Sequence, residues 1–175
     1  FDYVFCWLGN TNLILSIIKL IEDKMNLEHD IQEAGVQMIL LVEDSIRFYS
    51  SILPNLYNYI LEQSKNFSKE ALNRHAATMR MRGRPKVVLA RTYEEAQKLY
   101  DKYSNNTLGV ISDARFPLKS AAKAFGNKVE TEAKPKHRTD TFGREKCPDA
   151  GLQLFRYIRK NDPFVPLILE SSESD

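Results

Sequence analysis

The sequence predicts an α/β protein built on a doubly wound parallel sheet. Four short apolar runs, each of strand length, occupy residues 38–42, 87–90, 108–111 and 166–169. Continuous apolar runs bounded by polar residues are typical of parallel strands that are buried on both faces. Between the runs, apolar residues recur at helical spacing, and this strand–helix alternation indicates a sheet covered by helices. Three of the runs lead into carboxylates, which predicts a polar site at one edge of the sheet.

Composition is consistent with one ordinary α/β domain and some additional chain. The 175 residues are 43% hydrophobic and 27% charged, and the formal net charge is +2. A charge this small provides no general attraction to nucleic acid or to a membrane, and no apolar run is long enough to span a bilayer. The first residues lack a basic leader, so no signal peptide is expected. Cys6 and Cys147 match no metal-binding spacing, which favours a reduced, cytoplasmic setting.

The N-terminal part predicts a strand, a helix and a linker. Residues 3–8 form an apolar stretch that Gly9 and Asn10 turn. Apolar residues then recur at helical spacing from Leu13 to Ile21, which predicts a helix to about Met25. Residues 26–35 are polar and are interpreted as a linker before the strand at 38–42.

Two helices and a strand are predicted next. A long apolar stripe from Ile46 to Leu61 predicts one helix, in which Pro54 should introduce a kink. Weaker periodicity over residues 63–82 predicts a second, inserted helix before the strand at 87–90. Thr92 and Glu95 then form a capping box for a third helix, which ends near residues 105–106.

The stretch 118–148 is predicted to be a loop. It is rich in Lys, Ala, Thr and Gly, and it shows no sustained period. A loop this long inside a compact domain is usually mobile, so we expect it to be the least ordered part of the chain. Asp149 then caps a helix whose buried face should carry Leu152, Phe155 and Ile158.

Acidic residues lie at the ends of three of the predicted strands. Glu43 and Asp44 end the first strand, Asp113 ends the third, and Glu170 follows the fourth. Ser171 follows Glu170. Carboxylates and waters are the ligands that Mg²⁺ prefers, and a cation shared by three carboxylates relieves their repulsion. This edge of the sheet therefore predicts a magnesium-dependent phosphate site.

These stretches resemble the receiver domain of two-component response regulators. The resemblance rests on residues 39–44, 110–117 and 166–171, and residues 149–152 resemble the start of the receiver's third helix. It implies a flavodoxin-like (CheY-like) fold with strand order 2-1-3-4. It also implies the roles of single residues: Asp113 accepts the phosphoryl group, Ser171 senses it, and Mg²⁺ is bound weakly by Glu43, Asp44, Asp113 and the backbone carbonyl of Arg115.

The same resemblance implies a domain organisation. Residues 37–175 would form the receiver-like domain, truncated before its fifth strand and carrying insertions at 63–85 and 118–148. Residues 1–36 resemble the end of a preceding pseudo-receiver, whose strand at 3–8 could complete the sheet beside residues 167–169. Trp7 would then stand where receivers carry a lysine. No lysine would reach the site, and phosphorylation of Asp113 should be slow or absent.

The function implied is regulatory rather than enzymatic. A histidine kinase or a small phosphodonor would phosphorylate Asp113. The sequence leaves open whether the chain forms a homodimer. Residues 42–51 and 80–89 are also similar to regulatory regions ahead of phosphoenolpyruvate synthase or pyruvate phosphate dikinase-like enzymes, so attached catalytic domains would read the signal.

Two alternatives remain open from the sequence. The first is a pseudo-receiver that is not phosphorylated and serves as a protein-interaction scaffold. The second is DNA binding, because residues 82–85, Arg-Gly-Arg-Pro, match the core of the AT-hook, whose arginines enter a narrow minor groove. That stretch could equally be a basic turn before the next strand. His29, His75 and His137 are isolated and indicate no metal site.

Overall fold

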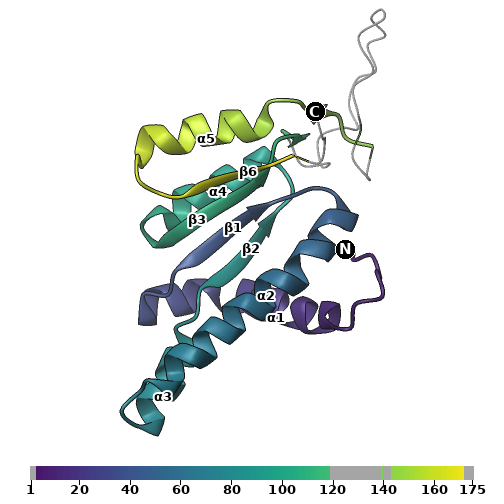
Figure 1. Ribbon diagram of the computed structural model, residues 1–175. Helices are drawn as coiled ribbons and strands as arrows, with labels where there is room; N and C mark the ends of the chain where they lie inside the picture. Colours follow the sequence, from purple (N-terminus) through teal and green to yellow (C-terminus); the bar gives the residue numbers. More distant parts are fainter. Residues whose placement is uncertain (1–2, 119–138, 140–142, 172–175) are drawn as a thin grey trace, which may run out of the picture. The chain divides into compact units, whose positions relative to one another are not determined.

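The computed structural model describes residues 3–118, 139 and 143–171. Its centre is a four-stranded, all-parallel sheet flanked by helices (Figure 1), with the strand order β2-β1-β3-β6. The strands are β1 (Met38–Val42), β2 (Lys86–Ala90), β3 (Thr107–Asp113) and β6 (Leu167–Glu170). The predicted α/β class and the predicted order of the four strands are both confirmed.

Burial follows the apolar runs that predicted the strands. Every residue of β2 is buried, and in β1 only Ile39 is partly exposed. β6 pairs in parallel with β3, where Asp113 is the register partner of Glu170, but most of β6 is exposed. Burial on both faces thus holds for β1 and β2, whereas β3 buries only Val110 and Ser112 and β6, at one edge of the described sheet, is mostly exposed.

The chain divides into two compact units, and the first is largely helical. It comprises Phe1–Ile39, Ile46–Val88 and Asn105–Leu108. It contains α1 (Asn12–Ala34), α2 (Ile46–Lys69, with Pro54 inside it) and α3 (Arg74–Arg82). α2 packs against both α1 and α3, as Figure 1 shows.

Two predictions for the N-terminal part are wrong. Residues 3–8 form no strand, because their backbone is bonded to side chains of α2 instead: the Cys6 N–H donates to Ser50 Oγ at 2.9 Å, and the Tyr49 hydroxyl donates to the Val4 carbonyl. Among the described strands, β6 therefore has β3 as its only neighbour. Residues 26–34 are helical rather than a linker. α1 ends at Gly35, whose φ of 60° closes the helix in the left-handed conformation.

α1 also buries a different face from the one predicted. Leu13, Leu20 and Leu27, spaced seven residues apart, are buried. Of the isoleucines that predicted the helix, Ile14 and Ile18 are each 56% exposed. The buried stripe continues to Leu27, so the polar second half of α1 also has a buried face. This burial explains why the helix does not stop near Met25.

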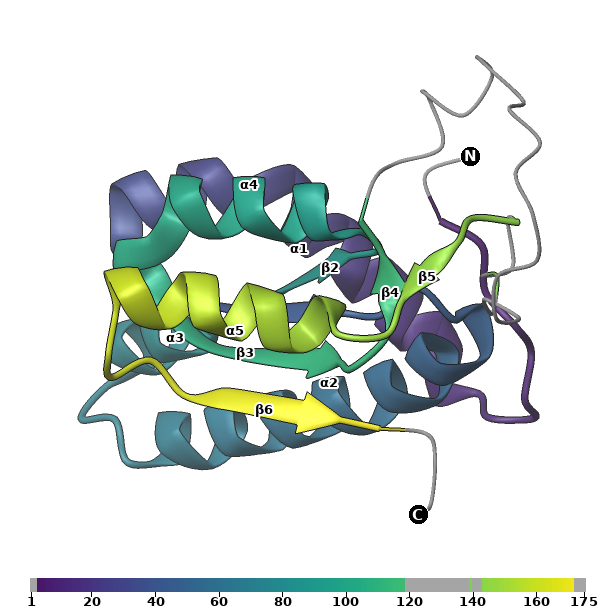
Figure 2. The same cartoon turned by 90° about the horizontal axis from the view of Figure 1, so that it is seen from above.

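The second unit holds the candidate site. It comprises Leu40–Ser45, Leu89–Ser104 and Gly109–Asp175. Helices α4 (Tyr93–Tyr103) and α5 (Ala150–Asn161) pack side by side in it (Figure 2). A short 3₁₀ turn, η1 (Ser104–Asn106), connects α4 to β3. The predicted N-cap of α4 is confirmed, because Thr92 Oγ accepts a hydrogen bond from the Glu95 N–H at 3.2 Å.

The helix after Asp149 is confirmed, and its predicted face is confirmed in part. α5 buries Ala150, Gly151, Leu154 and the predicted Ile158, whereas Leu152 is exposed and Phe155 is partly exposed. Asp149 occupies the N-cap position, but its side chain makes no capping hydrogen bond. The face that α5 buries is therefore set by its packing against β4 and β6 rather than by its cap.

A second, two-stranded sheet forms at the ends of the predicted loop. β4 (Phe116–Pro117) pairs antiparallel with β5 (Lys146–Cys147), and Thr139 forms an isolated bridge with Glu145. The predicted loop at 118–148 thus contains paired backbone at its C-terminal end, because β4 offers an adjacent strand. Residues 119–138 and 140–142, on which most of the mobility prediction falls, lie outside the described residues. Among the described helices, none is both long enough and apolar enough to cross a membrane.

Candidate functional site

Three predicted site residues come together in the second unit. Glu43 and Asp44 directly follow β1, and Asp113 is the last residue of β3. β1 and β3 are neighbours in the sheet, so their carboxyl ends lie at the same edge. Each of the three side chains offers one carboxylate oxygen, and these oxygens lie within 4.8 Å of one another. The expectation that the carboxylates form a cluster is confirmed.

The cluster is only partly open to solvent. Asp44 is fully buried and Glu43 is 4% exposed, whereas Asp113 is partly exposed. The backbone that leaves the sheet supplies donors: the Ser45 N–H donates to Glu43 at 2.8 Å, and the Ala114 N–H donates to Asp113 at 2.7 Å. These bonds fix the orientation of two carboxylates while leaving Asp113 accessible.

Burial strongly changes the acidity of this cluster. Burial, together with the negative charges of Asp113 and Asp44, raises the pKa of Glu43 to about 8, against the hydrogen bond from the Ser45 N–H and the charge of Lys146. Burial also raises the pKa of Asp113, while the Ala114 N–H and Lys146 oppose that change. The ion-free cluster therefore favours the protonated form of Glu43, and a bound cation would favour its charged form.

A lysine that the sequence analysis missed reaches the cluster. Lys146 Nζ lies 2.9 Å from each of the two carboxylate oxygens of Asp44, and its side chain is only 18% exposed. The two-stranded sheet places it there: β4 begins three residues after Asp113, and in the β4–β5 register Lys146 is the partner of Pro117. One lysine within a basic loop carries no sequence signal of its own, so only this pairing reveals it.

The expectation that no ammonium group would reach the site is therefore wrong. The lysine comes from β5 rather than from a fifth strand of the main sheet. Trp7, which was expected in its place, belongs to the non-strand segment of the first unit and is 59% exposed.

Ser171 and Arg115 flank the cluster along the backbone. Ser171 follows β6 immediately and is exposed, one position beyond Glu170, the register partner of Asp113. Its backbone position fits the predicted role, and the function of its hydroxyl stays a prediction. Arg115 lies between β3 and β4, and the metal-ligand role of its carbonyl stays a prediction as well. Ser172, which was chemically equivalent in the sequence, lies outside the described residues.

Gly151 is a further residue on which the cluster depends. It lies in the first turn of α5, and its N–H donates to the Ala114 carbonyl at 3.1 Å. A Cβ at this position would lie 2.4 Å from the Asp113 carbonyl oxygen and 3.1 Å from the Ala114 Cα. Only glycine lets α5 approach the end of β3 this closely. The glycine in the first turn of the helix, at Asp149-Ala150-Gly151, is the sequence signal that could have suggested this requirement.

The donor set fits a hard divalent cation. Three carboxylate oxygens from a partly buried cluster are the ligand type that Mg²⁺ prefers, and Mg²⁺ usually retains several waters beside one or two carboxylates. The residues present therefore suit the ion that the sequence predicted.

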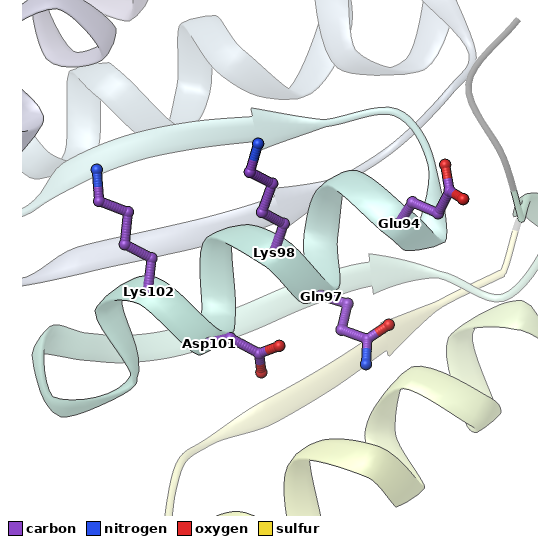
Figure 3. Close-up of a pocket in the computed structure, with 5 residues that line it drawn as sticks. All are labelled: Glu94, Gln97, Lys98, Asp101 and Lys102. Carbon is purple, nitrogen blue, oxygen red and sulfur yellow. The ribbon is translucent and has the colours of Figure 1, made fainter. Parts of the chain in front are cut away.

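A surface hollow elsewhere in the second unit contains none of these residues. It lies over the outer face of α4 and is lined by Glu94, Gln97, Lys98, Asp101 and Lys102 (Figure 3). The two lysines point to one side of the helix, while Gln97 and Asp101 point to the other, so no set of polar groups converges on a ligand.

The AT-hook-like stretch has a structural role in the first unit. Arg84 Nη2 lies 2.6 Å from Asp23 Oδ1, and the arginine side chain is 4% exposed. The Tyr57 hydroxyl and the Val87 N–H also donate to Asp23, each at 2.9 Å. An arginine buried in this network is not available to a minor groove, so DNA binding is not proposed.

Comparisons of the chain with family models, with curated proteins and with solved structures found no match.

Proposed function

We propose that the chain is a receiver-like regulatory domain in which Asp113 accepts a phosphoryl group in a Mg²⁺-dependent reaction. The observation that supports this proposal most is the carboxylate cluster: Glu43, Asp44 and Asp113 share one sheet edge, with the ammonium of Lys146 beside them. The four-stranded parallel order is compatible with the flavodoxin-like fold that the resemblance implies.

Each residue of the cluster would have a separate role in the reaction. A carboxylate oxygen of Asp113 attacks the phosphorus of the donor, and an acyl phosphate forms. The bond that breaks joins phosphorus to the donor's leaving atom, which is an imidazole nitrogen in a phosphohistidine and a carboxylate oxygen in acetyl phosphate. Asp113 suits this role because it is the most exposed of the three and is oriented by the Ala114 N–H. Glu43 and Asp44 would hold the Mg²⁺, which when bound neutralises charge on the transferred group. Ser171 would contact the phosphoryl oxygens from the end of β6.

The output would be a change in a surface that an attached phosphoenolpyruvate synthase-like enzyme or a separate partner reads. Phosphorylation adds charge at the meeting point of β3, β4 and α5, whose packing is tight at Gly151. The phosphodonor would be a histidine kinase or a small molecule such as acetyl phosphate.

Acetyl phosphate with MgCl₂, followed by intact-mass spectrometry, tests this proposal. The chain should gain the mass of one phosphoryl group, and Asp113→Asn should abolish the gain. Asp101→Asn, a carboxylate on α4 outside the cluster, is the matched control and should label as the wild type does. Labelling that survives Asp113→Asn would refute the assignment.

The exposed apolar face of α1 favours a second candidate function, an interaction scaffold that is not phosphorylated. Ile14, Ile18, Ile21 and Met25 lie exposed along one side of α1. An apolar helix stripe of this kind is a common partner-binding surface. A complete absence of labelling, with the fold intact, would favour this function over the first.

A further inference from the structure

We infer that Lys146 is the resident counter-ion of the carboxylate cluster, and that a divalent cation displaces its ammonium group from Asp44. The inference rests on the proposed function, because it concerns the same three carboxylates. It assigns to this chain a device that the resemblance does not imply, since the lysine comes from the two-stranded sheet β4–β5.

The first step is the charge balance of the ion-free site. Asp44 is fully buried, and an ionised carboxylate without a partner is costly in such a place. Lys146 Nζ contacts both of its oxygens at 2.9 Å. The lysine therefore places a positive charge directly against the Asp44 carboxylate, and it does so from a side chain that is itself mostly buried.

The second step is competition for the same oxygens. A cation held by Glu43, Asp44 and Asp113 needs carboxylate oxygens that now lie within 4.8 Å of one another. One member of that set already carries the ammonium of Lys146. Like charges repel strongly at contact range in a poorly solvated site, so the ion and the ammonium group do not share Asp44. The long flexible stem of lysine allows the ammonium to withdraw.

The third step connects the ion to the surface. Lys146 is the first residue of β5, and β4 follows β3 after two intervening residues. Release of the ammonium removes the ion pair between Lys146 and Asp44, which joins β5 to the end of β1. Occupation of the site by the ion is thereby coupled to the β4–β5 pair, which lies next to the N-terminal end of α5 (Figure 2).

Titration of the chain with MgCl₂, followed by calorimetry and by NMR, tests this inference. Lys146→Met should bind Mg²⁺ about tenfold more tightly than the wild type, because no ammonium has to be displaced. Lys146→Arg keeps the charge and should keep the affinity. Lys98→Met removes the same charge from the exposed face of α4 and controls for net charge; its affinity should change by less than about threefold.

The outcomes separate this inference from the proposed function. If the wild type binds Mg²⁺ and Lys146→Met binds it equally or more weakly, the displacement is refuted and the ion site stands. If neither the wild type nor any variant binds Mg²⁺, both are refuted. Should Lys146→Met fail to fold, the wild type decides: Mg²⁺ should shift the amide signals of both Asp113 and Cys147, and an unmoved Cys147 signal beside a shifted Asp113 signal would overturn the inference.

Discussion

Asp23 is the residue whose replacement tests the architecture of the first unit most directly. It is fully buried on α1 and accepts from Arg84 Nη2 at 2.6 Å and Nη1 at 3.1 Å, from the Tyr57 hydroxyl and from the Val87 N–H. Asp23→Asn retains the shape but removes the charge, and it turns one acceptor into a donor that faces other donors. Arg84 is then left as a buried charge without its partner.

The expected cost is large. Removing one partner of a buried ion pair typically destabilises a protein by about 3–5 kcal/mol, which is a major part of a usual free energy of unfolding of about 5–15 kcal/mol. Glu22→Gln is the matched control, because Glu22 is the neighbouring acid, is 40% exposed and lies 3.8 Å from the same Arg84 nitrogen. Exposed pairs contribute about 0–1 kcal/mol.

Urea unfolding followed by circular dichroism of the helices measures both changes. Tryptophan fluorescence is a poor probe here, because Trp7 is already exposed in the folded chain. A double-mutant cycle with Arg84→Met should give a coupling energy near the upper end of the usual range of about 0.5–3 kcal/mol. If Asp23→Asn costs no more than Glu22→Gln, the buried network does not hold α1 to the start of β2, and the reasoning fails.

Three further predictions concern the site and the helices. In the absence of divalent cations, the free energy of unfolding should fall as pH rises from about 4.5 to about 8, because folded Glu43 binds its proton more tightly than the unfolded chain does. In Glu43→Gln this pH dependence should flatten. An unchanged slope of unfolding free energy against pH would contradict the assignment. Gly151→Ala should destabilise the chain by about 1–3 kcal/mol or more and lower its thermal midpoint, because the added Cβ would overlap the Asp113 carbonyl. Gly109→Ala, whose Cβ would have its nearest contact at 3.4 Å, should lower the midpoint less. Equal effects of the two substitutions would refute the close approach of α5 to β3. On α1, Leu20→Ala should cost about 2–5 kcal/mol and Ile18→Ser less than about 0.5 kcal/mol in urea unfolding, and the reverse order would show that the buried face is misassigned.

Much of the second unit's site could be predicted from the sequence. The apolar runs that lead to Val42 and Asp113 are of strand length and are strands, and the carboxyl ends of neighbouring parallel strands meet at one edge. The sequence alone therefore predicts that Glu43, Asp44 and Asp113 lie together. The cap at Thr92 was equally local, because its partner Glu95 is three residues away.

The features that sequence reasoning missed depend on contacts between distant residues. Lys146 reaches Asp44 across 102 positions, and Arg84 reaches Asp23 across 61. Residues 3–8 have the composition of a strand, yet their backbone bonds to Ser50 and Tyr49 of α2. Strand propensity is weak where no strand partner is available, and side-chain donors and acceptors then take its place.

The sequence by itself thus determined the α/β class and the clustering of three carboxylates, because hydrophobic period and strand-end position are local properties of the chain. The order of the four strands was predicted through the resemblance to receiver domains. Only the tertiary structure decided which cation balances those carboxylates, which face of α1 is buried and where residues 3–8 lie. Each of these depends on which distant group supplies the missing charge, apolar surface or hydrogen bond, and a one-dimensional pattern does not carry that information.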